Sequence, residues 1–185
     1  MKLSLIFLSI KNVPKTNWSS DTPLNFKPKL KTFILLCLGL SLFGFGESLL
    51  IHSTIGVSPW TVLAEGISLK LHWSVGFATF IVSVMVLSSW IFLKQKPGLG
   101  TLLNIIIIAG TIDLSLFLFD FSTNNLLLNV LTGILGVLFV GLGSGIYLIA
   151  NLGPGPRDGL MTGLQRITKF PIAWVRASIE ISVVI

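Results

Sequence analysis

Long apolar segments with few charged residues dominate the hydrophobic pattern of this chain. Four of them lie at residues 32–52, 74–93, 99–119 and 126–150. Two of the four are free of charge, and the other two carry only Glu47 and Asp113. About 20 apolar residues in a helix, at 1.5 Å each, cross a hydrocarbon core of about 30 Å. We therefore predict four spanning helices. Residues 170–185 form a fifth apolar segment, which is shorter.

The composition supports a membrane protein. Hydrophobic residues make up 52% of the chain and charged residues 11%, with a mean hydropathy of +0.90. A soluble domain carries about 25% charged residues. We therefore expect an all-α, polytopic integral membrane protein.

Two turns rich in Gly and Pro separate the long segments, and each opens a helix too short to span. The turns are residues 55–60 and 152–161, and the helices are residues 61–71 and 162–168. Pro59 suits a first helical position, Ser58 can cap the helix, and Asp158 favours the positive end of the helix dipole. Each short helix lies either along the membrane interface or as a re-entrant element beside a cavity.

Glycines recur at a fixed spacing of 97 residues. Those at positions 39, 44, 46, 56 and 66 are followed by glycines at 136, 141, 143, 153 and 163. Leu38, Pro59 and Leu63 recur at the same spacing as Leu135, Pro156 and Leu160. Since only 18 of 185 residues are glycine, this agreement indicates a duplicated structural unit, a common plan in transporters.

The duplication predicts the domain organisation. We expect a basic N-terminal tail at residues 1–30, a three-span repeat at 31–122, and an incomplete second repeat with two spans at 123–185. Three spans is an odd number, so the second repeat is inverted relative to the first. The counterpart of the third span would lie beyond Ile185, so we expect the second repeat to be truncated. A five-helix protein with an atypical last repeat is the alternative.

Basic residues predict the orientation. Six lysines precede the first span, further basic residues follow the second and fourth spans, and residues 120–125 contain no Lys or Arg. The positive-inside rule then places the N-terminus in the cytoplasm. The net charge of +6 is thus a membrane feature, so the expected partner is the lipid bilayer and no nucleic acid.

Metal, redox and enzymatic signals are weak. Cys37 is the single cysteine, and His52 and His72 are isolated near helix ends. We therefore expect no metal and no cofactor. The chain has no Gly-x-Ser-x-Gly, His-Glu-x-x-His or paired-aspartate motif, so we do not expect an enzyme.

Several motifs carry a resemblance to a known family. These are residues 56–60 (Gly-Val-Ser-Pro-Trp), 97–101 (Pro-Gly-Leu-Gly-Thr) and 152–161 (Leu-Gly-Pro-Gly-Pro-Arg-Asp-Gly-Leu-Met), with Arg176 and Glu180 downstream. From Lys31 to Ile185 the chain resembles the YczE-like group of the YczE/YyaS/YitT bacterial membrane proteins. The resemblance implies a multi-helix protein of the bacterial plasma membrane with no established activity. The expected second Gly-Leu-Gly-Thr segment is missing from residues 1–185, and the basic N-terminal extension is not part of the resemblance.

Charged and helix-opening residues in or beside the spans are the candidates for substrate binding or ion coupling: Glu47, Pro59, Pro156, Arg157, Asp158, Arg176 and Glu180. A lone charge at the bilayer centre costs about 3 kcal/mol. Because Arg176 and Glu180 are four residues apart, we expect them to pair. The pair belongs either to a functional site or to a structural link between helices.

Two functions remain open. An inverted repeat with paired Gly/Pro turns is typical of a transporter, here for a small molecule or peptide. The alternative is a non-transporting accessory protein that assembles with a membrane partner.

Overall fold

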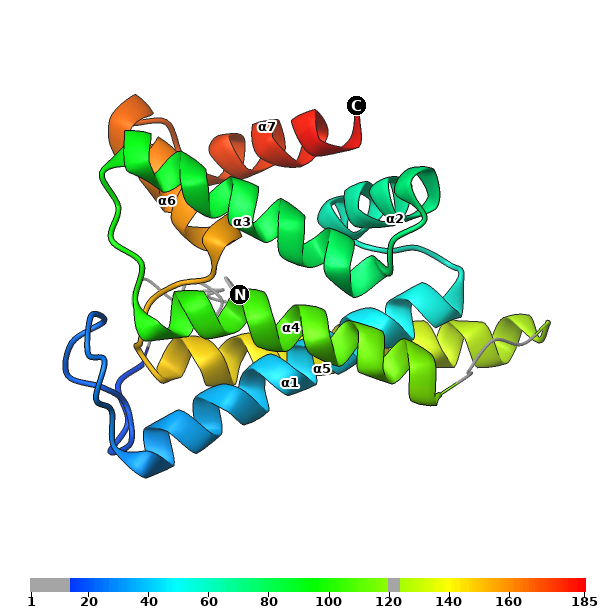
Figure 1. Ribbon diagram of the computed structural model, residues 1–185, viewed down its shortest axis with the longest axis horizontal. Helices are drawn as coiled ribbons and strands as arrows, with labels where there is room; N and C mark the ends of the chain where they lie inside the picture. The colour runs from blue at the N-terminus through cyan, green and yellow to red at the C-terminus, as the bar shows by residue number, and fades with distance from the viewer. Residues whose placement is uncertain (1–13, 120–123) are drawn as a thin grey trace, which may run out of the picture.

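The computed structural model describes residues 14–119 and 124–185, and every regular element in these ranges is a helix (Figure 1). The helices are α1 (Leu30–Ser53), α2 (Pro59–Leu71), α3 (Val75–Leu93), α4 (Leu99–Leu118), α5 (Leu126–Ile149), α6 (Pro156–Thr168) and α7 (Ile172–Val184). The first part of the predicted tail and most of the predicted 120–125 connection lie outside the described residues.

Four helices are long and apolar enough to cross a membrane, namely α1, α3, α4 and α5. Their bounds agree with the four predicted spans to within two residues, which confirms the prediction. The other three helices have 13 residues each, about 20 Å at 1.5 Å per residue, which is shorter than a hydrocarbon core. The apolar segment 170–185 therefore forms a short helix within the described residues.

Local sequence explains how the two short helices begin and end. Both start at a proline, Pro59 in α2 and Pro156 in α6, where the missing N–H costs nothing. The Ser58 hydroxyl accepts a hydrogen bond from the backbone N–H of Thr61 at 3.3 Å and caps α2. Each helix ends at a left-handed residue, His72 or Lys169. These starts and ends recur at the 97-residue spacing of the glycines.

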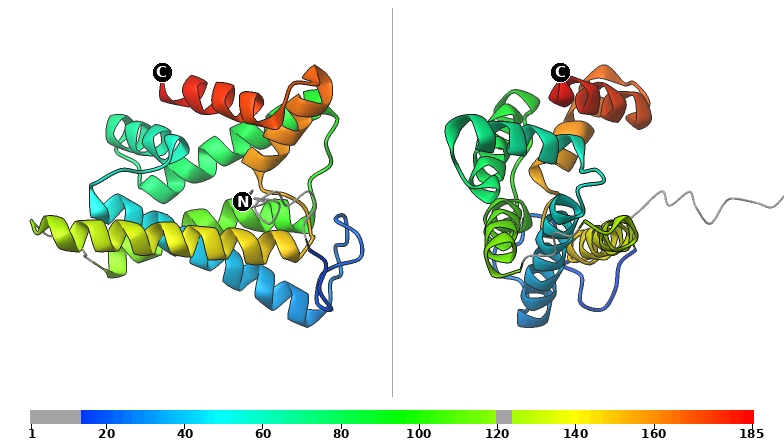
Figure 2. Two further views of the ribbon diagram at one scale, coloured as in Figure 1. Left: turned by 180° about the vertical axis from the view of Figure 1, so that it is seen from behind. Right: turned by 90° about the vertical axis from the view of Figure 1, so that its right-hand side faces the viewer.

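Helices α1 and α5 pack antiparallel along a seam of glycines (Figure 2). A Cβ atom at Gly143 would lie 2.5 Å from the carbonyl oxygen of Gly39, and one at Gly136 would lie 2.9 Å from that of Gly46. No larger side chain fits without moving the backbone. Glycines in such seams let two membrane helices approach closely.

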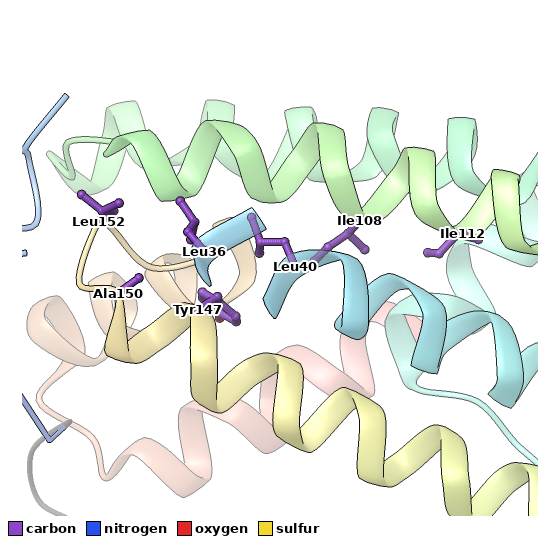
Figure 3. Close-up of a cluster of buried hydrophobic side chains, with 7 residues drawn as sticks. All are labelled: Leu36, Leu40, Ile108, Ile112, Tyr147, Ala150 and Leu152. Atoms are coloured by element: carbon purple, nitrogen blue, oxygen red, sulfur yellow. The ribbon is translucent and has the colours of Figure 1, made fainter. Parts of the chain in front are cut away.

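Helix α4 covers the other side of α1 and completes the main apolar core. Figure 3 shows this cluster, which consists of Leu36 and Leu40 of α1, Ile108 and Ile112 of α4, and Tyr147, Ala150 and Leu152 at the end of α5. A Cβ atom at Gly44 would lie 2.8 Å from Thr111 Cβ, so α1 and α4 also meet at a glycine. The core thus lies between α1, α4 and one end of α5.

The remaining helices form a second group beside α1, α4 and α5 (Figure 1). Helix α2 packs on α3 and α7, and α6 packs on the same two helices. Asp113 of α4 joins the groups: it accepts hydrogen bonds from the Ser74 hydroxyl at 2.5 Å and the Gly76 N–H at 2.7 Å. It therefore neutralises the N-terminal end of α3.

The described part of the N-terminal segment folds against the end of α5. The Ser20 N–H donates to the Ala150 carbonyl oxygen at 3.0 Å, and the Asn151 side chain donates to the Ser20 carbonyl oxygen at 2.8 Å. Ser20 itself is buried. Residues around Ser20 are thus part of the folded body.

Candidate functional site

A polar cavity of about 430 Å³ lies among the helices, and all seven of them contribute to its wall. Six of the seven candidate residues line it: Glu47, Pro59, Arg157, Asp158, Arg176 and Glu180. The spans contribute residues from their middle turns, including Phe43 of α1 and Ser83 of α3. The structure therefore brings almost all of the predicted site into one place.

Glu47 anchors one side of the cavity. It is buried in α1, and its carboxylate accepts a hydrogen bond from the Thr61 hydroxyl at 2.7 Å. The oxygen atoms of Thr61 and Ser58 lie 2.8 Å apart, which extends the chain of hydroxyl groups to the start of α2. A buried carboxylate needs such partners because an unpaired charge is costly to desolvate. Glu47 thus fixes the N-terminal end of α2 against α1.

Asp158 makes a similar link at the start of α6. Its carboxylate accepts a hydrogen bond from the phenol of Tyr147, the one tyrosine in the chain. Asp158 also lies in the first turn of α6, where a negative charge is favourable. This contact fixes the N-terminal end of α6 against α5.

Arg157 connects the two short helices across the cavity. The guanidinium carbon lies 5.1 Å from the centroid of the Trp60 ring, the geometry of a cation–π interaction. Burial lowers the pKa of Arg157, and the nearby carboxylates of Glu47 and Asp158 oppose that shift. Arg157 therefore lies near both carboxylates, at the point where α2 and α6 begin.

Pro156 does not line the cavity but is buried behind it. Its carbonyl oxygen accepts a hydrogen bond from the indole N–H of Trp90 at 3.0 Å. The Trp90 ring lies so close to Gly159 that a Cβ atom there would be 1.8 Å away. Trp90 thus positions the first turn of α6.

The turn before α6 is held by the start of α4. The Gly100 N–H donates to the Leu152 carbonyl oxygen at 2.7 Å, and the Thr101 hydroxyl donates to the Pro154 carbonyl oxygen at 2.7 Å. Buried backbone groups need such partners because an unsatisfied one costs free energy. Two of the motifs noted in the sequence, residues 97–101 and 152–161, therefore contact each other.

Arg176 and Glu180 form the expected ion pair on α7. The Arg176 Nε atom lies 2.7 Å from a carboxylate oxygen of Glu180, and the two side chains are 68% and 34% exposed. The pair faces the cavity and is open on one side. With it the cavity holds three carboxylates and two guanidinium groups, so it suits a polar or charged solute.

Sequence reasoning missed the residues that hold the candidates in place, chiefly Tyr147, Trp60, Thr61 and Trp90. Two signals were present in the sequence. Tyr147 is a lone phenol inside an uncharged span, and Trp60 lies 97 residues before Arg157.

The fold and the cavity define a multi-pass helical membrane protein with a polar site among its helices. The profile of the family of unknown function DUF6198 matches residues 30–185. The chain belongs to that family.

Three relatives support this assignment. An uncharacterized protein of Haemophilus influenzae is 38% identical over 174 residues, which is 94% of this chain and 78% of the relative. The uncharacterized membrane protein YczE of Bacillus subtilis is 31% identical over 78% of this chain and 68% of its own length. The uncharacterized protein YyaS of the same organism is 32% identical over 75% and 71%. These relatives confirm the resemblance found in the sequence. No solved structure matches.

Proposed function

We propose that this protein is a transporter of a small molecule or peptide, built from two inverted repeats, with the polar cavity as its binding site. One observation carries the proposal. The N-terminal ends of α2 and α6 both line the cavity, together with mid-span residues such as Phe43 of α1 and Ser83 of α3. In this proposal the short helices are re-entrant, and their positive ends meet beside the bound solute.

Reciprocal contacts support the inverted repeat. Gly39 contacts Gly143 and Gly46 contacts Gly136, while positions 39 and 46 correspond to 136 and 143 at the 97-residue spacing. Each glycine therefore meets the counterpart of the other, as in a two-fold symmetric interface.

The short helices show the same reciprocal packing between corresponding elements. By the spacing of their first residues, α2 and α3 correspond to α6 and α7. Helix α2 packs on α7 and α6 packs on α3. Trp60 and Arg157 are corresponding positions and touch each other, so the pseudo-two-fold axis passes between them through the cavity. An axis through the binding site is typical of inverted-repeat transporters.

The charged groups suggest which solutes fit. Arg157 can bind a carboxylate, and Glu47 and Asp158 can bind an amine. A zwitterion such as an amino acid or a short peptide satisfies both. In the proposed orientation the N-terminus is cytoplasmic and the protein lies in the bacterial plasma membrane, supported by the basic residues near the start of α1 and near the ends of α3 and α6.

A flux assay tests the proposal. The purified protein is reconstituted in proteoliposomes and tested for uptake of radiolabelled amino acids and dipeptides. We expect uptake above that of empty liposomes for at least one solute, lost in Arg157→Gln and retained in Arg166→Gln. Arg166 is a matched control because it lies on the same helix and does not line the cavity. No uptake of any tested solute by the native protein would contradict transport. Equal uptake by both variants would contradict the cavity as the binding site.

The second candidate is a membrane accessory protein without transport activity. The observation that favours it is the outer face of α5, where large apolar side chains such as Leu127, Leu131 and Val137 are exposed. An accessory protein would give no uptake in the flux assay.

A further inference from the structure

An apolar groove of about 380 Å³ runs between α1 and α5, away from the polar cavity. It is lined by Leu50, Ser53, Ile55, Gly56, Val130, Gly133, Ile134, Val137 and Leu138. The Ser53 hydroxyl bonds to the Leu50 carbonyl oxygen at 2.7 Å, so it does not call for a polar ligand. The groove therefore suits an apolar occupant.

The groove corresponds to the main core with one helix removed. Without the two α4 residues, that core contains five residues: Leu36, Leu40, Tyr147, Ala150 and Leu152. At the 97-residue spacing their counterparts are Gly133, Val137, Leu50, Ser53 and Ile55, and all five line the groove. What the core has and the groove lacks is the pair Ile108 and Ile112 of α4.

Two glycine pairs show the same difference. A Cβ atom at Gly44 would meet α4, whereas one at its counterpart Gly141 has nothing within 4 Å. A Cβ atom at Gly153 would lie 2.8 Å from the Thr101 hydroxyl at the start of α4, whereas one at Gly56 has nothing within 4 Å. Every contact that α4 makes with these positions in one half is missing in the other.

We propose that the groove is the docking site of one more membrane-spanning helix with the chemistry of α4. Its occupant is an apolar partner helix that starts with small residues beside Gly56 and places two branched aliphatic side chains, four residues apart, in the groove, the first of them against Val137. Close approach at Gly141 completes the contact. The inference rests on the inverted arrangement in the proposed function and is independent of transport.

Cross-linking tests this site with a defined probe. The probe is a peptide of residues 97–119 of this chain carrying Ile108→Cys, added to the chain of residues 1–185 with Cys37→Ala and Val137→Cys in proteoliposomes under oxidising conditions. Leu40 of the native core, the counterpart of Val137, lies in one cluster with Ile108. We expect at least about tenfold more disulfide product than with Leu135→Cys, about 1.4 kcal/mol of selectivity. Leu135 is the matched control because its counterpart Leu38 stays exposed although α4 covers α1.

A second pair of variants separates docking from folding. Gly141→Leu should leave the chain folded, since nothing lies within 4 Å, and should abolish the cross-link. Gly110→Leu in the chain, on an open part of α4, should retain the cross-link. Equal cross-linking at Val137 and Leu135, or full cross-linking in Gly141→Leu, would overturn the proposal. So would efficient pairing of Val137→Cys between two copies of the chain with none to the peptide, because the occupant would then be a second copy. Loss of flux with a retained cross-link would refute only the transport function.

Discussion

Helices α1 and α5 have the same length and the same glycine spacing but very different surroundings. Both have 24 residues, yet 44% of the most apolar part of α1 is buried, against 11% of that of α5. The difference comes from α4, which packs along α1. A sequence pattern can therefore define a packing surface, while neighbouring helices determine whether that surface is filled.

The largest expected effect concerns whether the two repeats have opposite orientations in the membrane. Leu71 and Thr168 end α2 and α6 and are corresponding positions. If the halves are inverted, Leu71→Cys in the Cys37→Ala background is labelled in intact cells by a membrane-impermeant maleimide, and Thr168→Cys only after permeabilisation. The expected effect is all or none. Labelling of both residues from the same side would refute the inversion.

A large stability difference is expected between two glycines of α5. Gly143→Leu forces a side chain into the backbone of α1, because even a Cβ atom at this position would lie 2.5 Å from the carbonyl oxygen of Gly39. We expect a loss of about 3 kcal/mol or failure to insert, because overpacking here must move a helix. Gly141→Leu should change stability by less than about 0.5 kcal/mol. Thermal melting in detergent, followed by size-exclusion chromatography, measures both.

Similar melting curves for the two variants would contradict this prediction. They would mean that the glycine seam between α1 and α5 does not contribute to the stability of the fold.

Two of the three cavity carboxylates, Glu47 and Asp158, allow a comparison in which the expected effect is of moderate size. Tyr147→Phe removes the hydroxyl that donates to Asp158, and Thr61→Val removes the one that donates to Glu47. Each change leaves a carboxylate without a donor, so we expect a loss of about 1–3 kcal/mol. Thr61→Val should cost more because Glu47 is the more buried acid. Chemical unfolding in mixed micelles measures the difference.

As a control, Thr132→Val removes an exposed hydroxyl of α5 that bonds only within its own helix. A loss as large as that of Thr61→Val would show that the cavity carboxylates are not the cause.

The smallest effect is expected for the ion pair on α7. Arg176 is 68% exposed towards an open cavity, so screening reduces the attraction between its guanidinium and Glu180. A double-mutant cycle with Arg176→Leu and Glu180→Leu should give a coupling of about 0.5 kcal/mol. A coupling above about 2 kcal/mol would place the pair in a dry environment and favour a structural role.

Local signals explain how much of the fold was predictable. The spans follow from runs of apolar residues, and the start of α2 follows from Pro59, because both signals lie within one segment. Helix α6 begins at Pro156, earlier than the predicted start at Thr162, because the proline and Asp158 already belong to its first turn. Five of the six predicted cavity residues carry a charge, and charges in or beside apolar segments are expensive and therefore need a reason.

Contacts between distant segments were not predictable. The capping of α3 by Asp113 and the packing of Trp90 on Gly159 join residues 37 or more positions apart. The contact of Ser20 with Ala150 spans a still longer separation. No periodicity or turn motif records such pairings, because they depend on which faces meet in three dimensions.

The stacking of Arg157 on Trp60 also gives the molecule an optical reporter. Indole emission responds to the charge beside the ring, and the chain has five tryptophans. Trp18, Trp73 and Trp174 can be replaced with phenylalanine. Trp60 would then be the fluorophore in the cavity, and the buried Trp90 would be an internal reference behind it. A solute that displaces the guanidinium would change the emission of Trp60 and leave that of Trp90 unchanged. Ligands could then be sought by titration before any flux has been measured.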